Sequence, residues 1–451
     1  MENNKKSSFS GRLGYVMAVA GSAVGLGNIW RFPYLAAKYG GGTFLVTYVI
    51  LALTVGFALL LSETALGRKT RKNPIQAYHQ LGAKKLRFGG WLNSIIPMLI
   101  VPYYCVVGGW VCKYLYAYLT GAAHKLTQDN YFTQFISDPI SPAFWLVVFA
   151  LLTFIVVIKG VEKGIEKVSK VLMPLLVVMA AFIAVYGLTT PGAIEGLKYY
   201  LIPDFSRFSI MTVIAAMGQM FYSLSIGMGI LFTYGSYMKK DVDMEKAITQ
   251  VEIMDTLIAF LAGLMIIPAV FAFSGKGSLN AGASLMFITM PKVFDSLALG
   301  HIIGVVFFLL VLFAALTSAI SLTECAVATF MEQFHFSRKK AALTSLIGIL
   351  ALGIPTSLGY GLLSWIQPLG MTILDFFDFI TNSCMMPISA LCTVLLVIKV
   401  TGFKTIHDEV ASTSAFKREK AYIFSMRYIC IPTLIIILLS YILSTFGFIT
   451  L

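Results

Sequence analysis

Charged residues, cysteine and histidine are scarce in this chain, and their scarcity narrows the functions it could perform. Only 12% of the 451 residues are charged, with 6 cysteines and 5 histidines. No two cysteines have Cys-x-x-Cys spacing, and no histidine stands in a zinc or Ser-His-Asp pattern. The sequence therefore gives no support for a metal centre, a disulfide framework or hydrolysis, and it has no phosphate-binding loop for ATP-driven pumping. We do not expect an enzyme.

Basic residues outnumber acidic residues, and the positions of the basic residues along the chain explain the excess. There are 34 Lys and Arg against 21 Asp and Glu, a net charge of +13. Positive charge gathers on the cytoplasmic side of membrane proteins. A cytoplasmic N-terminus therefore accounts for the excess without a nucleic-acid partner. Most basic residues lie in the N-terminal tail and in segments 68–87, 159–170, 239–246, 338–340 and 399–420.

Hydrophobic residues are abundant, at 58% of the chain with a mean hydropathy of +0.83. About 20 apolar residues are needed to cross a hydrocarbon core of about 30 Å. We predict an all-α, polytopic protein of the cell (plasma) membrane, surrounded by the lipid bilayer, with eleven transmembrane helices. An odd number of spans places the C-terminus outside. The predicted spans are 13–38, 43–67, 92–120, 143–160, 167–190, 210–238, 247–274, 302–331, 340–358, 370–398 and 422–447.

The first predicted span is interrupted by polar and helix-weakening residues. The stretch from Gly21 to Pro33 contains three glycines, Asn28 and Arg31 inside an otherwise apolar run. Broken helix at membrane depth is tolerated only where protein or a water-filled cavity satisfies the freed backbone groups. The segment therefore predicts a binding site within the membrane.

A second interruption lies in the sixth span, where Ser223-Leu224-Ser225-Ile226-Gly227-Met228-Gly229 places serines and glycines in mid-helix. One such break is equally well explained by helix packing through small residues. Two breaks at matching positions favour a five-plus-five inverted repeat with discontinuous helices 1 and 6 and a site at the midplane. The predicted division is a tail at 1–12, a first repeat at 13–190, a second repeat at 210–398, a cytoplasmic loop at 399–421, and a last helix with an external C-terminus at 422–451.

Polar residues elsewhere in the spans suggest what this site binds. Unwound carbonyls suit a cation, and the positive end of a following half-helix suits a carboxylate, so an amino acid and a cation together fit both ends. Asp255 is a functional candidate because a carboxylate in the membrane is costly, whereas Thr317 and Ser318 alone are weak candidates. Glu63 and Glu324 are interpreted as polar packing residues.

Several separate motifs occur together, and as a set they resemble one transporter family. Beside Gly21–Pro33 these are Gly-x9-Pro at 164–174, Gly-Gln-Met-Phe-Tyr-Ser-Leu-Ser at 218–225, Leu-Thr-Ser at 316–318 and Leu-Asp-x-x-Asp-Phe at 374–379. From about residue 6 to 447 the chain resembles the neurotransmitter:sodium symporter family, in particular its bacterial amino-acid symporters. The resemblance implies sodium-driven uptake of an amino acid by alternating access.

The same resemblance implies two Na+ sites made of oxygen ligands. The first would use the Ala23 carbonyl, Asn28, Ser223, Asp255 and the substrate carboxylate. The second would use carbonyls of Gly21, Val24 and Ala314 with the hydroxyls of Thr317 and Ser318.

The substrate positions also follow from the resemblance. The carboxylate would meet the N–H groups of Leu26 and Gly27 and the Tyr104 hydroxyl. The ammonium would meet carbonyls of Ala23, Tyr222 and Ser223 and the Ser225 hydroxyl. Because the expected side-chain pocket is uncharged and Met228 is flexible, we expect a neutral hydrophobic L-amino acid, large and aromatic ones included. That pocket comprises Ile100, Tyr222, Met228, Ser318, Ala319 and Leu322.

Gates on both sides of the membrane complete the implied transporter. Arg31 and Asp378 match an outer ion pair, with Tyr222 as an aromatic lid beneath it. The expected inner gate has Lys6, Phe9 and Glu332 in place of the family's usual Arg, Trp and Asp, together with a matching Tyr237. Gly164 and Pro174 match a motif of the fifth helix that can unwind.

Two departures from the family pattern shape the remaining expectations. Asp255 stands where many relatives have Asn, and Ala259 follows one turn later. A fixed negative charge there would replace chloride, so chloride-independent transport is expected. A twelfth span is missing from the pattern, and we expect a monomer or a weak homo-oligomer.

Two other functions stay open on the sequence alone, and a third, a channel, is disfavoured. A relative of the same fold could carry a small neutral substrate or an osmolyte, and a sensor could keep the site without transport. A channel would need a continuous polar pore or charged rings, and the predicted spans contain neither.

Overall fold

Helices of membrane-spanning length occupy the segments that hydropathy predicts. The computed structural model describes residues 7–274 and 283–448, and in this part of the chain eight helices are long and apolar enough to cross a bilayer. Two further helix pairs, each bent at a short break, also qualify. The predicted span 210–238 is divided between two shorter helices. The all-α, polytopic prediction is confirmed.

The helices of the first half of the chain include both long spans and short connecting helices. Near the N-terminus, a short break and a π-helical turn, η1 (Gly27–Arg31), separate the first two helices. The helices are α1 (Arg12–Ala23), α2 (Phe32–Lys38), α3 (Gly42–Leu51), α4 (Phe57–Thr70), α5 (Pro74–Gln80), α6 (Arg87–Leu119), α7 (Tyr131–Ser137), α8 (Ser141–Val157), α9 (Lys167–Leu188) and α10 (Ala193–Leu201).

The second half contains a similar mixture of lengths. Its helices are α11 (Ile210–Ser223), α12 (Ile230–Tyr237), α13 (Met244–Ser274), α14 (Met290–Asp295), α15 (Gly300–Phe334), α16 (Arg338–Leu358), α17 (Ile373–Asp378), α18 (Met386–Leu396), α19 (Phe403–Ala411), α20 (Glu419–Phe424) and α21 (Cys430–Thr445). Further π-helical turns are η2 (Ala52–Gly56), η5 (Val161–Glu166), η7 (Leu285–Thr289), η9 (Phe379–Met385), η10 (Val397–Thr401) and η11 (Ser425–Ile429). Short 3-10 turns are η3 (Lys84–Leu86), η4 (Ala123–Thr127), η6 (Phe205–Arg207) and η8 (Pro368–Gly370).

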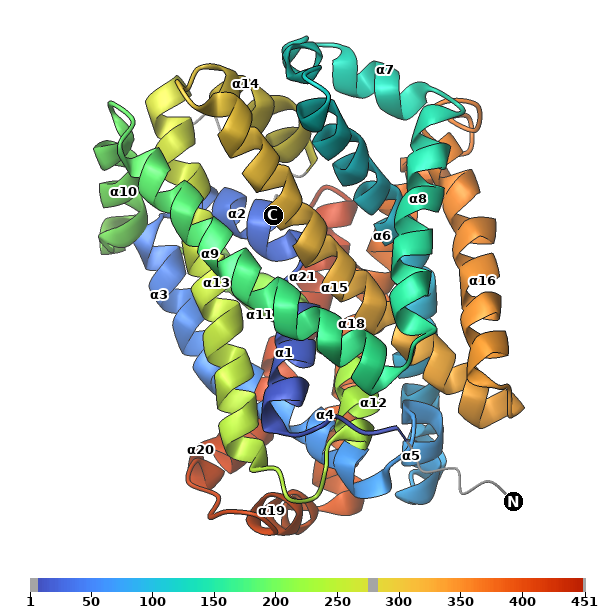
Figure 1. The fold of residues 1–451 in the computed structure, drawn as a ribbon. Coiled ribbons are helices and arrows are strands. Elements are labelled where there is room, and N and C mark those ends of the chain that lie inside the picture. Colours follow the sequence, from blue (N-terminus) through green and yellow to red (C-terminus); the bar gives the residue numbers. More distant parts are fainter. Residues whose placement is uncertain (1–6, 275–282, 449–451) are drawn as a thin grey trace.

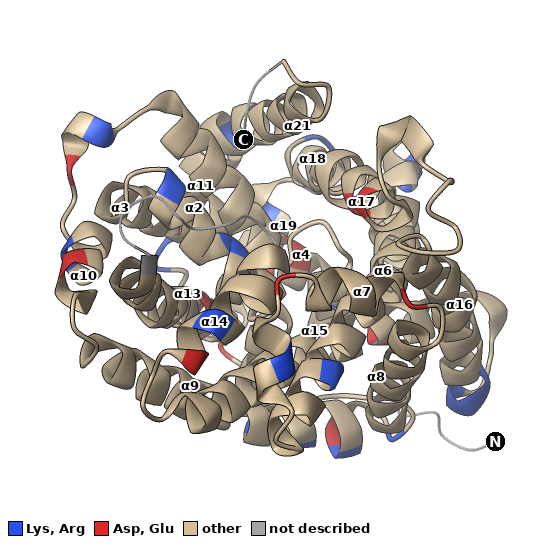
Figure 2. Cartoon of the chain, turned by 90° about the horizontal axis from the view of Figure 1, so that it is seen from above, with Lys and Arg blue, Asp and Glu red and all other residues tan. Residues whose placement is uncertain are grey.

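The two broken helices lie inside the bundle, and the long helices surround them. Figure 1 shows α1 and α12 near the centre, with α9 and α15 passing across them, and α1 packs against α9, α13 and α15. The short helices α5, α19 and α20 gather at one end and α7, α10 and α14 at the other. Charged residues lie mainly on loops and helix ends, around helices that are almost uncharged (Figure 2). The interior is mostly apolar, and its buried charged groups include Arg68 paired with Glu409 and Glu324 paired with Arg338.

The first break bends the chain because the helix stops after Ala23 and resumes at η1. The helical segments on either side of residues 24–26 meet at an angle of 56°. Gly25 lets the broken segment approach its neighbours, since a Cβ there would lie 2.8 Å from the Ser318 hydroxyl oxygen. The predicted interruption is therefore present, and it faces α15.

The second break depends on backbone conformations that glycine adopts without strain. Residues 224–229 separate α11 from α12, and Gly227 and Gly229 have φ values of +76° and +71°. Their N–H groups donate to Glu63 Oε1 and Asn93 Oδ1, each at 3.0 Å. Glu63 is thus more than a packing residue, because it satisfies an amide that the break leaves free at membrane depth.

Candidate functional site

A buried carboxylate joins the two breaks. Asn28 Nδ2 donates to Asp255 Oδ1 and to Ser223 Oγ, both at 2.8 Å, and Ser223 Oγ donates to the same carboxylate oxygen at 2.8 Å. The Tyr48 hydroxyl donates to Asp255 Oδ2 at 2.8 Å. All these donors are neutral and Asp255 is fully buried, so the negative charge is hydrogen-bonded but not neutralised by them. A cation bound here would supply the missing positive charge.

The structure therefore brings together three of the four residues predicted for the first Na+ site in one hydrogen-bonded group. Ala23, the fourth, lines the cavity directly beside them. Every ligand that these residues offer is a carboxylate, amide, hydroxyl or carbonyl oxygen, which is the donor set that a hard cation prefers.

A second group of oxygens lies between α1 and α15. The Ser318 hydroxyl is 3.4 Å from the carbonyls of both Gly21 and Val24, and Thr317 Oγ1 donates to the Ala314 carbonyl at 3.1 Å. A Cβ on Gly21 would lie 3.1 Å from the Thr317 Cβ, so the glycine allows this approach. Of the five residues predicted for the second Na+ site, Gly21, Val24, Thr317 and Ser318 thus meet between the two helices, and Ala314 is joined to Thr317 within α15.

A small cavity of about 30 Å³ lies between these oxygen groups. One water needs about 10–15 Å³ by this measure, so the space holds about two waters. The Leu26 N–H donates to the Tyr104 hydroxyl at 3.3 Å on one wall. Of the residues predicted to bind substrate, the cavity lining includes Ala23, Leu26, Gly27, Ile100, Tyr104, Tyr222, Ser223, Ser225, Met228, Ser318 and Leu322.

Ala319 is fully buried on α15 and does not belong to that lining. Ser22, Gly25 and Ile230 line the cavity without having been predicted as substrate contacts. Ser225 Oγ donates to the Ser22 carbonyl at 3.2 Å, which ties the two breaks together.

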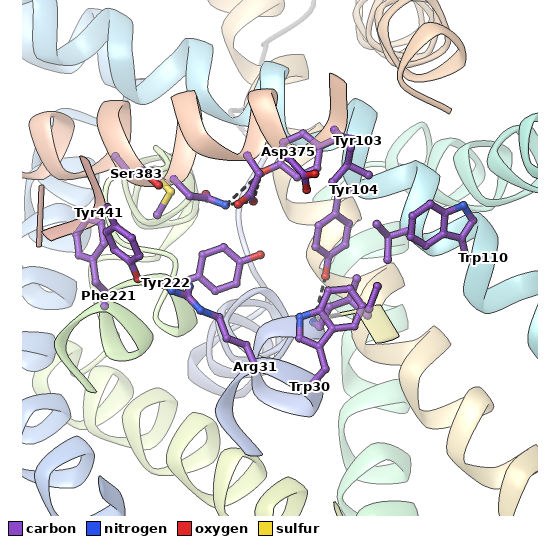
Figure 3. Close-up of a pocket in the computed structure, with 18 of the residues that line it drawn as sticks. Trp30, Arg31, Tyr103, Tyr104, Trp110, Phe221, Tyr222, Asp375, Ser383 and Tyr441 are labelled. Carbon is purple, nitrogen blue, oxygen red and sulfur yellow. Dashed lines mark hydrogen bonds between the residues drawn. The ribbon is translucent and has the colours of Figure 1, made fainter. Parts of the chain in front are cut away.

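A larger cavity of about 350 Å³ lies directly outside the small one. Leu26, Tyr104 and Tyr222 line both, so the Tyr222 ring stands between them as the predicted lid would. In Figure 3, Arg31 and Trp30 rise from one side of this outer cavity, and Tyr103 and Asp375 lie on the opposite side. The two cavities together form a path from one end of the bundle to the breaks.

Arg31 and Asp378 both line this outer cavity, but each has a different hydrogen-bond partner in this structure. Arg31 donates to the Tyr441 hydroxyl of α21, and its guanidinium carbon lies 5.4 Å from the centre of the Tyr222 ring. Asp378 Oδ1 accepts from Asn382 Nδ2 at 2.5 Å and from the Tyr103 hydroxyl at 3.3 Å. The predicted outer pair is therefore placed within one cavity with its two halves apart, and its role as a gate stays a prediction.

At the opposite end of the bundle the structure closes around Glu324. Arg338 forms an ion pair with this buried carboxylate at 2.5 Å, and the Tyr237 hydroxyl donates to it at 2.9 Å. The Phe9 ring packs on Tyr237 with centroids 6.2 Å apart. Glu324 therefore binds Tyr237, one of the residues predicted for the inner gate, whereas the sequence alone suggested polar packing for Glu324.

Two other predicted parts of the transporter are placed separately. Lys6 lies outside the described residues, and its expected partner Glu332 accepts a hydrogen bond from the Asn73 N–H at 2.8 Å. Gly164 lies in the π-helical turn η5, and Pro174 lies within α9, so the predicted hinge begins on an irregular turn.

The main contributors that sequence reasoning missed are Tyr48, Tyr441 and Asn382. None stands beside a glycine break, and each lies in an apolar helix where a polar aromatic or amide is ordinary. Glu63 carried a usable signal, because a buried carboxylate in an apolar span needs a named partner.

Comparison with known proteins agrees with this geometry. The family model described as "Sodium:neurotransmitter symporter family" matches residues 6–142 and 131–450. A sodium-dependent transporter of Bacillus subtilis is 35% identical over 456 residues, covering 99% of this chain and 100% of that protein. A sodium- and chloride-dependent GABA transporter 2 of Rattus norvegicus is 26% identical over 98% of this chain and 82% of that protein.

Solved structures give the same result. The crystal structure of MhsT in complex with L-phenylalanine is 38% identical to this chain and superposes with a TM-score of 0.87, covering 97% of this chain and 100% of that chain. Several predicted motifs, the two helix breaks and the full-length matches therefore lead to one conclusion. The chain belongs to the sodium:neurotransmitter symporter family of sodium-dependent membrane transporters.

Proposed function

We propose that this protein imports neutral hydrophobic L-amino acids, aromatic ones included, together with Na+, by alternating access and without chloride. The observation that carries the proposal is that the two breaks meet at Asp255. Its carboxylate accepts hydrogen bonds from Asn28 beside the first break and from Ser223 beside the second, and Asn28 also donates to Ser223. The basic cytoplasmic segments support a location in the cell membrane with the N-terminus inside and the C-terminus outside.

The backbone of an amino acid fits the polar end of the small cavity. Leu26 and Gly27 lie where the first helix resumes, and the N-terminus of a helix favours a carboxylate. The Tyr104 hydroxyl, already bonded to Leu26 N, would complete this contact. Ser225 and the carbonyls of the second break would receive the ammonium group.

The apolar end of the cavity supports a hydrophobic side chain. Ile100, Met228, Ile230 and Leu322 line it, and none of the described lining residues is charged. An unpaired charged side chain would be costly in such a site. Met228 is unbranched and adaptable, which suits substrates of different sizes.

Sodium-dependent uptake into proteoliposomes tests the proposal directly. Labelled phenylalanine should accumulate when Na+ is outside and should not when K+ replaces it. Excess unlabelled leucine, tryptophan or tyrosine should compete, whereas glutamate and lysine should not. Competition by glycine or betaine alone would instead indicate a small-substrate or osmolyte transporter.

Chloride independence has its own test. The Asp255 carboxylate supplies a fixed negative charge beside the first predicted Na+ site, and Ala259 follows it on α13 with no polar group. Uptake should therefore keep most of its rate when gluconate replaces chloride. Loss of most uptake would contradict this part of the proposal.

A sensor without transport is the second candidate, and the gates distinguish it. Asp378→Asn should abolish sodium-driven uptake while binding of labelled phenylalanine in detergent persists. Binding without measurable uptake in the parent protein would favour the sensor.

A further inference from the structure

The arginine of the predicted outer gate is held by the last helix. Arg31 donates a hydrogen bond to the Tyr441 hydroxyl, and its guanidinium carbon lies 5.6 Å from the centre of the Tyr441 ring. Figure 3 shows Arg31 reaching toward Tyr441 and Tyr222, with Asp375 and Tyr103 on the far side of the cavity. The charge of Arg31 is thus satisfied by an aromatic hydroxyl and two ring faces.

Asp378 is likewise satisfied elsewhere. Asn382 and Tyr103 donate to its Oδ1 atom, and Asn382 Nδ2 also donates to the Tyr103 hydroxyl at 3.2 Å. Arg31 and Asp378 are both half-buried in the wall of one cavity. For the two charges to pair, Arg31 must first leave Tyr441.

The surroundings of Tyr441 leave room for its ring and for this exchange. Gly218 of α11 lies beneath the tyrosine hydroxyl, where a Cβ would overlap it. Trp30, Arg31 and Tyr441 also line a second cavity of about 310 Å³ on the other side, between α2, α11 and α21. Arg31 and Tyr441 therefore separate the outer cavity from this second cavity, and each side of their contact borders open space.

We propose that Tyr441 is a positioning residue that holds Arg31 in the open position of the outer gate and competes with Asp378 for it. The inference rests on the proposed function in treating the outer cavity as the substrate's entrance and Arg31 and Asp378 as its gate. A hydrogen bond to a charged group is strong enough that its loss should shift the balance between open and closed gates by about tenfold.

Cysteine accessibility tests this without using transport. Leu374 lines the outer cavity, so Leu374→Cys reports how open the gate is when labelled with a membrane-impermeant maleimide in sodium-free vesicles. The labelling of the parent protein, which contains only the native cysteines, is subtracted from each measured rate. Adding Tyr441→Phe, which removes the hydroxyl and keeps the ring, should slow labelling about tenfold. Tyr428→Phe, an exposed tyrosine of the same span, is the matched control and should not change the rate.

A second background separates a gate effect from misfolding. Asp378→Asn removes the charge that competes with Tyr441 for Arg31. When Tyr441→Phe is added to Leu374→Cys in this background, the labelling rate should stay nearly unchanged. An unchanged rate when Tyr441→Phe is added with Asp378 intact, or an equal fall with and without Asp378→Asn, would overturn the proposal. Because no substrate is added, these results stay interpretable even if the uptake assay fails.

Discussion

At the scale of single residues, the decisive property is a buried carboxylate whose partners are all neutral. Asp255 accepts three hydrogen bonds from Asn28 and Ser223 at one oxygen and Tyr48 at the other. Neutral donors make a buried anion tolerable without cancelling its charge. The residue therefore keeps an attraction for a cation that a buried salt bridge would already have used.

Asp255→Asn removes this charge and keeps the shape of the side chain. The concentration of Na+ that gives half-maximal phenylalanine uptake should rise at least tenfold, equivalent to about 1.4 kcal/mol of binding free energy. Asp241→Asn, at an exposed position after α12, is the matched control and should leave it unchanged. An unaltered sodium dependence in Asp255→Asn would place the ion elsewhere.

Glu63 offers a second test, on stability. Its Oε1 accepts from the Gly227 N–H within a fully buried environment. Glu63→Ala leaves that amide unsatisfied, which costs about 1–3 kcal/mol of unfolding free energy. Glu63→Gln retains an acceptor oxygen, so its melting temperature in detergent should be lowered much less than that of Glu63→Ala. If glutamine proves as damaging as alanine, the charge and not the acceptor matters.

At the scale of elements, the two breaks are built differently. The first is a short gap followed by a π-helical turn, and the second is a loop with left-handed residues at 225, 227 and 229. The positive φ of Gly227 and Gly229 favours glycine at these positions, because a side chain in this conformation costs about 1–2 kcal/mol. The second break is therefore fixed by backbone geometry, whereas the first is shaped by close packing against α15.

Gly227→Ala should consequently lower thermal stability and uptake together. Its Cβ would be strained by the positive φ and would lie 2.7 Å from the Met386 carbonyl oxygen. Gly348→Ala is the matched control, because Gly348 is within α16 and a Cβ there meets nothing within 4 Å. That control should be neutral or stabilising by about 0.5–1 kcal/mol. Equal melting temperatures for the two variants would contradict this account.

The sequence predicted these elements well and their partners poorly. Spans and breaks are local signals, since apolar length and clustered glycines such as Gly227 and Gly229 can be recognised without knowing what they touch. Asn93, Tyr48 and Tyr441 reach the site only because distant helices pack beside it, and no periodicity in their own segments indicates that. The Na+ and substrate residues were placed by family resemblance, which transferred positions that the residues alone did not determine.

At the scale of the whole molecule, this structure is open at one end and tied at the other. The outer cavity extends down to the Tyr222 ring, whereas Glu324, Arg338 and Tyr237 join α15, α16 and α12 at the opposite end. In the alternating access proposed above, these two ends would exchange such states. On that proposal, we expect the contacts of Glu324 to break in the state that opens to the other side.

Glu324→Gln should loosen the inner end selectively. The substitution removes the carboxylate that pairs with Arg338, and with it the charge of a fully buried side chain. Hydrogen exchange at residues 9–16 should become faster in Na+-containing buffer, because Phe9 at the start of this segment bonds to the Tyr237 carbonyl and packs on its ring. Glu195→Gln, exposed on α10, is the control. Unchanged exchange in Glu324→Gln would show that closure does not depend on this cluster.

The size of the small cavity between the two breaks has a consequence for affinity measurements. A space of about 30 Å³ cannot hold a phenylalanine side chain, so Tyr222 and its neighbours must move before any large substrate is bound. The measured dissociation constant then equals the intrinsic one divided by the fraction of molecules already enlarged. A substitution that only loosens the aromatic lid should tighten binding of all large substrates by one common factor. The ranking among leucine, phenylalanine and tryptophan would be preserved, and selectivity would have to be altered at the cavity wall itself.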